Sequence, residues 1–125
     1  MNASLSLGAQ GEAHAAHYLL QQGYHILHRN WRCQRGELDL IAQQTTLDGN
    51  GIWVFVEVKS SRSADNEQAR ANLTPRKLAR CVASAQVFLD QHALSEVQWR
   101  LDVILVGRAH SSVPLIEHVE DALAW

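Results

Sequence analysis

The sequence contains few cysteines and no pair of them with the spacing of a metal site. Among the 125 residues only Cys33 and Cys81 occur, and there is no C-x-x-C motif. These features argue against the disulfide framework of a small secreted domain and against a zinc knuckle. We therefore expect two free thiols and a protein that works in the reducing cytoplasm.

Long apolar runs and a strong net charge are also missing. No apolar run approaches the roughly 20 residues that cross a bilayer. The N-terminal stretch MNASLSLGAQGE has neither the basic nor the apolar region of a signal peptide. The formal net charge is only −2, so the whole molecule has no strong electrostatic attraction to nucleic acids or anionic membranes. We expect no membrane partner.

The charge that is present is distributed unevenly. Between Arg29 and Arg80, nine Lys and Arg residues accompany six Asp and Glu residues, a net charge of +3. The rest of the chain carries two basic and seven acidic residues, a net charge of −5. A basic middle is thus masked by acidic ends. An ordinary solvated surface explains this pattern as well as a binding surface does.

The length and the order of the expected elements predict one α/β domain over residues 1–125. A chain of this size can bury about two-thirds of its unfolded surface around one core. Periodicity predicts a helix over 8–23, a second helix with Thr74 as N-cap and Pro75 at its first position, and strands over 24–31, 34–43, 52–60 and 97–107. Residues 61–73 are expected to form a mobile loop with a helical fragment, and residues 113–125 a short strand or irregular segment ending in one helical turn. This order predicts a mixed central sheet flanked by helices.

Glu12 is the informative residue of the first helix. It lies three, four and seven positions before Ala15, Ala16 and Leu19, so its carboxylate projects along the apolar stripe. A carboxylate on that face needs a partner. The alternative is a glutamate at the edge of the stripe, which reaches solvent and is stabilised by the helix macrodipole.

The strand at 52–60 places an acid and an amine side by side. Strand alternation puts Glu57 and Lys59 on the face of Phe55, opposite to three valines. In the strand at 34–43 the same rule puts Glu37, Asp39 and Ile41 on one face and Leu38 and Leu40 on the other. The Asp-Gly and Asn-Gly pairs of TTLDGNG predict a tight turn between these strands. Asp39 is therefore expected to approach Glu57.

Two neighbouring carboxylates repel each other unless a cation neutralises them, and a hard divalent ion suits oxygen ligands. Lys59 beside such an ion can orient a water molecule or stabilise a phosphoryl group. These parts suit metal-assisted hydrolysis of phosphodiesters. The alternative is a surface ion pair between Glu57 and Lys59 on an edge strand, worth under about 1 kcal/mol.

The motifs GxxGExxAxxxL (from Gly8), GELDLIA and VFVEVKS together resemble the YraN family of small bacterial proteins. That family is similar to Holliday-junction resolvases of the PD-(D/E)xK superfamily. The resemblance extends through RLDVILV to the C-terminus and implies a restriction-endonuclease-like, three-layer fold. It also implies an Mg²⁺ or Mn²⁺ ion held by Asp39, Glu57 and the Val58 carbonyl, with Lys59 as catalytic lysine and Glu12 as helix-borne acid. The chain departs from the family after EVK, where Ser60, Ser61 and Arg62 replace Thr-Arg and the following loop lacks a glycine.

Seven basic side chains are the candidates for contacts with nucleic acid. Arg76, Lys77 and Arg80 lie in the first turns of a helix, where the macrodipole disfavours cations and a bound phosphate would favour them. The alternative is that their stems cover apolar surface. The stretch RNWRCQR alternates basic residues with Trp31, which suits backbone contacts and base stacking, although a partly buried tryptophan explains it too. The full set is Arg29, Arg32, Arg35, Arg62, Arg76, Lys77 and Arg80.

Other polar residues have simpler interpretations. Glu37 assists Asp39 or pairs with a nearby arginine, and the pairing is favoured. Asp102, two residues after Arg100, is expected to form a structural ion pair or hydrogen bonds. His14 and His17 are three apart on a helix, which is compatible with a transition metal, but solvent-facing side chains are favoured.

The function expected from the residues and the resemblance is a divalent-metal-dependent endonuclease. Its substrate is DNA rather than RNA, including branched or structured DNA. A homodimer fits because resolvases of this superfamily make two symmetric cuts. One alternative is a module that binds nucleic acid or joins an assembly without catalysis. Another is a protein-interaction domain with an incidental ion pair.

Overall fold

A computed structural model describes residues 5–124. Residues 1–4 and Trp125 lie outside the described residues. They are part of the domain expected over 1–125, and residues 1–4 also begin the N-terminal stretch that was compared with a signal peptide. The elements are α1 (Leu7–Gln21), β1 (His25–Cys33), β2 (Gly36–Gln44), β3 (Ile52–Ser60), α2 (Glu67–Ala71), α3 (Pro75–Gln91), β4 (Trp99–Gly107), β5 (Leu115–Val119) and the 3₁₀ turn η1 (Ala122–Ala124). No helix within 5–124 is long and apolar enough to cross a membrane.

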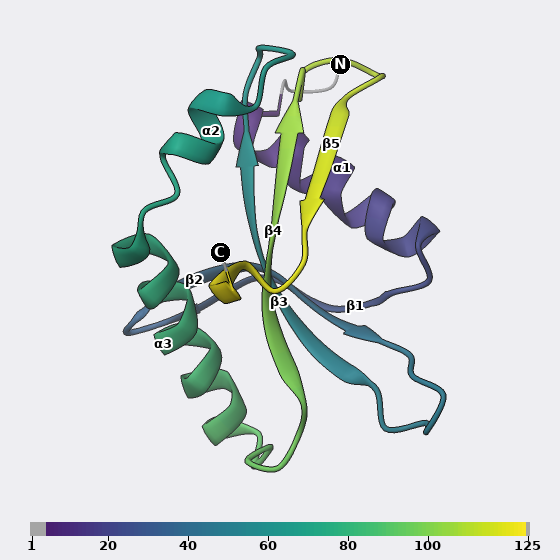
Figure 1. Cartoon of the computed structure of the whole chain (residues 1–125), viewed down its shortest axis with the longest axis vertical. Coiled ribbons are helices and arrows are strands. Elements are labelled where there is room, and N and C mark those ends of the chain that lie inside the picture. The colour runs from purple at the N-terminus through teal and green to yellow at the C-terminus, as the bar shows by residue number, and fades with distance from the viewer. Residues whose placement is uncertain (1–4, 125) are drawn as a thin grey trace.

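The strands form one five-stranded mixed sheet in the order β1-β2-β3-β4-β5 (Figure 1). Neighbouring strands are antiparallel except β3 and β4, which are parallel. A parallel pair needs a long crossover, and α2 and α3 supply it between β3 and β4. The prediction of an α/β protein with a mixed sheet and flanking helices is confirmed.

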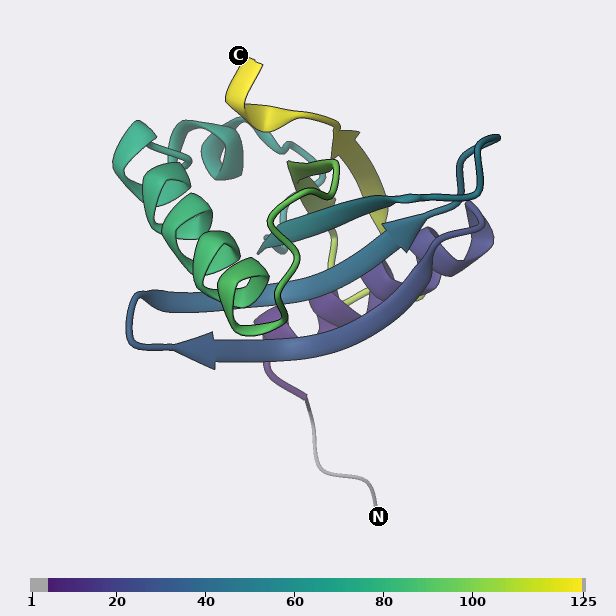
Figure 2. The same ribbon diagram turned by 90° about the horizontal axis from the view of Figure 1, so that it is seen from below.

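Helices cover both faces of the sheet, and Figure 2 shows α1 and α3 on opposite sides of the curved β1–β2 pair. On one face Ala15, Ala16 and Leu19 of α1 pack against Val54 and Val56. On the other face Phe88 and other apolar residues of α3 pack against Phe55 and Leu101. β3 is thus a central strand, buried between two helical layers.

The local signals for helix α3 are confirmed in detail. Thr74 is the N-cap, and its side chain accepts a hydrogen bond from the Lys77 backbone N–H at 3.2 Å. Pro75 occupies the first helical position, where its missing N–H costs nothing. The helical fragment expected in 61–73 is α2, and the short strand and final turn expected in 113–125 are β5 and η1.

The prediction that Leu38 and Leu40 share a face of β2 is wrong. Leu38 packs with Phe88 in the α3 layer, whereas Leu40 packs with α1. The alternation breaks at Asp39, beyond the point where pairing of β2 with β3 ends at Leu40. In β1, Asn30 adopts a left-handed conformation (φ 53°) in the same part of the sheet. β2 therefore coils at Asp39, and this bend shapes the site.

Candidate metal centre

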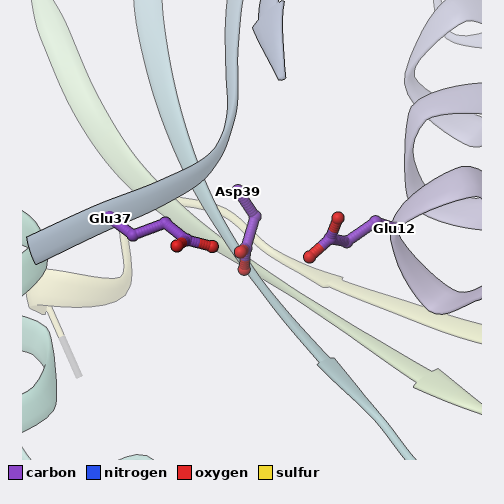
Figure 3. Close-up of side chains that lie close together, drawn as sticks. All are labelled: Glu12, Glu37 and Asp39. Carbon is purple, nitrogen blue, oxygen red and sulfur yellow. The ribbon is translucent and has the colours of Figure 1, made fainter. Parts of the chain in front are cut away.

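Three carboxylates from α1 and β2 converge at the bend of β2. One oxygen each of Glu12, Glu37 and Asp39 lies within 4.8 Å of the other two. Figure 3 shows Asp39 between Glu37, from the same strand, and Glu12, from the helix. We call these three residues the acidic cluster. An all-oxygen donor set of this kind suits a hard divalent cation.

Asp39 is the buried member of the acidic cluster, with 8% of its surface exposed. Its Oδ2 accepts a hydrogen bond from the Val58 backbone N–H at 2.7 Å, which links β2 to β3. Burial, and after it the charge of Glu57, raise the pKa of Asp39 to about 8, and Glu12 and Glu37 add to the rise. A divalent cation would relieve this repulsion and favour the ionised form.

Glu57 and Lys59 form a partly buried pair on the α3 side of β3. Lys59 Nζ lies 3.5 Å from Glu57 Oε1, and the two side chains are 31% and 18% exposed, respectively. Burial raises the pKa of Glu57, and Lys59 and Cys81 oppose that rise. Because β3 is central, the interpretation of this pair as a surface contact on an edge strand is wrong.

Cys81 of α3 contacts the same carboxylate. Its Sγ donates a hydrogen bond to Glu57 Oε2 at 3.5 Å. Burial and the charge of Glu57 raise the pKa of Cys81 to about 12, so the group remains a thiol. Both Cys81 and Cys33 are free. Cys81 is one of the buried residues of α3, and no pattern in the sequence indicates its contact with Glu57.

A cavity of about 250 Å³ opens beside the acidic cluster, and we call it the Lys59 cavity. It is lined by Glu37, Glu57, Lys59, Lys77, Arg80 and Cys81, together with Gly36. Three cations from β3 and α3 therefore face one space that also contains two acids. This combination can hold an anionic group next to a metal ion.

Two further cavities place arginines close to the acidic cluster. Arg32 and Arg35 line a space of about 440 Å³ at the β1–β2 turn, and this space shares Gly36 and Glu37 with the Lys59 cavity. Arg29 and Glu12 line a third space of about 170 Å³ against α1. Arginines from β1 and its turn thus lie on both sides of the carboxylates.

The remaining candidates are outside these cavities or have structural roles. Arg62 and Arg76 are exposed. Trp31 packs edge-on against Phe88 with a centroid distance of 5.3 Å, which favours a core role over base stacking. Within the described chain, His14 and His17 join no group of metal-ligand geometry.

Glu37 pairs with an arginine and also lies beside Asp39. Arg32 Nε lies 3.0 Å from Glu37 Oε2, although the Arg32 side chain is 76% exposed. The same Glu37 side chain belongs to the acidic cluster. The predicted pairing of Glu37 with an arginine is thus present. The sequence alone did not predict that Glu37 lies beside both Asp39 and Glu12. The Glu-x-Asp spacing places Glu37 near Asp39, but no pattern in the sequence indicates that Glu37 also lies close to Glu12.

The similarity to known proteins extends over all residues of the candidate site. The model of the "Uncharacterised protein family UPF0102" matches residues 11–106, a range that includes the acidic cluster, Glu57 and Lys59. UPF0102 proteins of Roseiflexus castenholzii and Geotalea uraniireducens are each 41% identical to this chain over 120 and 117 residues. These alignments cover 94% of this chain and 92% and 88% of the relatives. A UPF0102 protein of Frankia casuarinae is 38% identical over 98% of this chain and 99% of its own length.

The motifs around Glu12, Asp39 and Glu57 resemble the YraN family, and the matches above extend over nearly the full chain. A family model covers most of the described elements from α1 to β4. The chain belongs to the UPF0102 family, which is the YraN family.

Proposed function

We propose that this protein is a divalent-metal-dependent endonuclease that hydrolyses phosphodiester bonds in DNA, including branched or structured DNA. The observation that carries the proposal is the position of the acidic cluster beside a partly buried Glu57–Lys59 pair. The α1 and α3 layers around a mixed sheet agree with a restriction-endonuclease-like, three-layer fold. Such a fold would bring helix and strand carboxylates to one end of the central strands.

The ligands proposed for Mg²⁺ or Mn²⁺ are Asp39 and Glu57 with the Val58 carbonyl, and Glu12 and Glu37 complete the oxygen-rich surroundings. The raised pKa of Asp39 supports this assignment because like charges crowd a buried carboxylate that has one backbone N–H as its donor. When bound, the ion would supply a more acidic water and charge stabilisation for the phosphoryl oxygens.

Lys59 has the central role among the protein's own groups. Its ammonium group lies 3.5 Å from Glu57 and faces the Lys59 cavity, so it can orient a water and stabilise negative charge on the phosphoryl group. In hydrolysis the water oxygen gives up one proton and bonds to phosphorus, one P–O ester bond breaks, and the departing oxygen takes up a proton. Lys77 and Arg80 would hold the phosphate next to the reacting one.

Cleavage within a strand requires that nucleic acid continue in both directions from the site. The Lys59 cavity and the space lined by Arg32 and Arg35 both border Glu37, and Arg29 lines a further space beside Glu12. Basic side chains therefore lie near both ends of the acidic cluster. This arrangement supports an endonuclease over an enzyme that binds a strand end. Arg29, Arg62 and Arg76 would extend the contacts with phosphates, and a homodimer would place two such sites for symmetric cuts.

The test is cleavage of a substrate panel consisting of a four-way junction, a flap, single strands and supercoiled plasmid, with Mg²⁺ and with Mn²⁺. We expect metal-dependent cleavage that falls about 100- to 1,000-fold in Glu57→Gln and Lys59→Ala, because each removes a charge at the reacting centre. Glu96→Gln, which changes an exposed acid, is the control.

Binding of the four-way junction by Lys59→Ala should persist, because most contacts with phosphates lie elsewhere. Unchanged cleavage in both site variants would contradict the proposal. Salt-dependent binding without cleavage under every metal condition would instead favour a module that binds nucleic acid and keeps the fold without turnover.

A further inference from the structure

Helix α1 crosses the end of β3 in very close contact at Gly11. A Cβ atom built on Gly11 would lie 1.7 Å from Ser60 Oγ and 2.7 Å from Ser60 Cβ. Real Cβ atoms essentially never approach another heavy atom within 3.0 Å. One turn earlier in the same helix, Gly8 has nothing within 4 Å of the corresponding position. The lack of a side chain is therefore essential at Gly11 and not at Gly8.

The two residues in contact are chain neighbours of two site residues. Gly11 directly precedes Glu12, and Ser60 directly follows Lys59. We propose that the contact between Gly11 and Ser60 sets the position of Glu12 relative to Asp39, so that Gly11 and Ser60 are positioning residues for cation binding. This inference rests on the proposed function, because it assumes that the acidic cluster takes part in holding a divalent cation.

A rotation of the Ser60 side chain cannot accommodate a methyl group on Gly11. Rotation would move Oγ away, but Ser60 Cβ would remain at 2.7 Å. An alanine at this position must therefore push α1 away from β3. The helix is rigid over one turn, so Glu12 would move with it.

Cation binding is sensitive to such a movement. Bonds from Ca²⁺, Mg²⁺ or Mn²⁺ to carboxylate oxygens are about 2.0–2.6 Å long, and productive sites tolerate errors of only about 0.5 Å. The oxygens of the acidic cluster already lie within 4.8 Å of one another, close to what one ion can bridge. A displacement of α1 would take the Glu12 carboxylate out of that range.

Removal of the Ser60 side chain should compensate for the added methyl group. In Gly11→Ala/Ser60→Gly both clashing atoms are gone, and the nearest remaining atom is Ser60 Cα at 3.7 Å, an ordinary contact distance. The double variant should therefore restore the position of α1. If Gly11→Ala lowered only the stability of the fold and left its geometry unchanged, Mn²⁺ affinity would not fall, and Ser60→Gly would have no loss to restore.

The experiment measures Mn²⁺ affinity by calorimetric titration of the full chain, without nucleic acid. We expect Gly11→Ala to weaken Mn²⁺ binding by at least about 10-fold, the loss typical of altered support around a metal site. Gly11→Ala/Ser60→Gly should recover to within about 3-fold of the wild type. Gly8→Ala is the matched control and should bind like the wild type.

Each outcome bears on a different statement. Unchanged Mn²⁺ affinity in Gly11→Ala, or no recovery in the double variant, overturns the positioning role alone. If Gly11→Ala does not fold, the double variant must fold and bind Mn²⁺, and its failure overturns the inference. If the wild type shows no Mn²⁺ binding, both this inference and the proposed metal-dependent function are wrong.

Discussion

Two buried aspartates have similar neighbours in the sequence and lie in the same sheet, but their pKa values are shifted in opposite directions. Asp39 of β2 lies in LDL and Asp102 of β4 lies in LDV. Burial by itself would raise the pKa of both carboxylates. The pKa of Asp39 rises to about 8, whereas hydrogen bonds from His118, Arg100 and the Asp121 backbone hold the pKa of Asp102 below its ordinary value.

The difference lies in the partners. Asp102 Oδ1 accepts from Arg100 Nε at 2.9 Å and from the Asp121 N–H at 3.0 Å, while Oδ2 lies 2.7 Å from His118 Nε2. The network continues from His118 Nδ1 to the Tyr18 hydroxyl at 3.0 Å, which joins β4 and β5 to α1. The expectation of a structural ion pair at Asp102 is confirmed.

Asp39 is surrounded mainly by other acids, with the Val58 N–H as its hydrogen-bond donor. Because its pKa is lowered in the folded protein, ionised Asp102 adds stability at neutral pH, whereas ionised Asp39 costs stability there unless a cation binds. The comparison thus separates the structural Asp102 from the candidate metal ligand Asp39 by their partners and not by burial.

The largest expected effect comes from breaking the network of Asp102. Asp102→Ala would leave Arg100 and the buried network without their common acceptor, which costs about 3–5 kcal/mol when one partner of a buried pair is removed. Chemical denaturation at pH 7 measures the loss. Asp90→Ala, an exposed acid on α3, should change the free energy of unfolding by less than about 0.5 kcal/mol. A loss as small in Asp102→Ala would contradict its structural role.

Asp39→Asn should instead increase the free energy of unfolding of the metal-free protein. The folded state binds the Asp39 proton more tightly than the unfolded state, in which the pKa is about 3.9. The wild type therefore loses stability as the pH rises from about 4 to about 8, and the loss is complete above the folded-state pKa. Asparagine carries no charge, so the variant should avoid this loss.

Asp39→Asn should be more stable than the wild type by at least about 2 kcal/mol at pH 8 and equally stable at pH 4, since one pKa unit is worth about 1.4 kcal/mol and the folded-state pKa lies several units above the unfolded one. Denaturant titrations at both pH values, with a chelator present, measure it. Added Mn²⁺ should stabilise the wild type at pH 8 and leave Asp39→Asn unaffected. A variant that is less stable than the wild type at pH 8 without metal would contradict this picture of Asp39.

Sequence reasoning works where the signal is local. The alternation of β3 puts Glu57 and Lys59 on one face, and a Thr-Pro pair marks the start of α3. Both follow from periodicity or capping chemistry within a few residues. The placement of Glu12 along the apolar stripe of α1, where its partly buried carboxylate lies near Asp39 and Glu37, is equally local, because it depends on helical spacing.

Sequence reasoning fails where distant elements decide the geometry. The alternation of β2 breaks at Asp39 because pairing with β3 ends there, and this brings Glu37 toward Glu12. The contact of His118 with Asp102 depends on the register of β5 against β4. The closeness of Gly11 and Ser60 depends on how α1 packs. No pattern within a single segment specifies these contacts.

The smallest predicted effect concerns Glu57. Its surroundings are intermediate between those of Asp39 and Asp102, because it has an amine and a thiol as partners. Cys81→Ala removes the S–H donor to Glu57 Oε2, so the pKa of Glu57 should move further above its ordinary value. A thiol is a weak donor, so the contribution is about 1 kcal/mol or less. Carbon NMR titration of labelled glutamate side chains in the metal-free protein measures the pKa directly.

Cys81→Ser keeps a donor at the same position and should hold the pKa of Glu57 close to its wild-type value. Cys33→Ala is the matched control, because Cys33 is the other free thiol and lies at the end of β1, in the space lined by Arg32 and Arg35. If Cys81→Ala and Cys81→Ser shift the Glu57 titration equally, the thiol acts only by filling space. In that case Lys59 is the partner that limits the rise in the pKa of Glu57, and Asp39 differs from Glu57 because it has no such cation beside it.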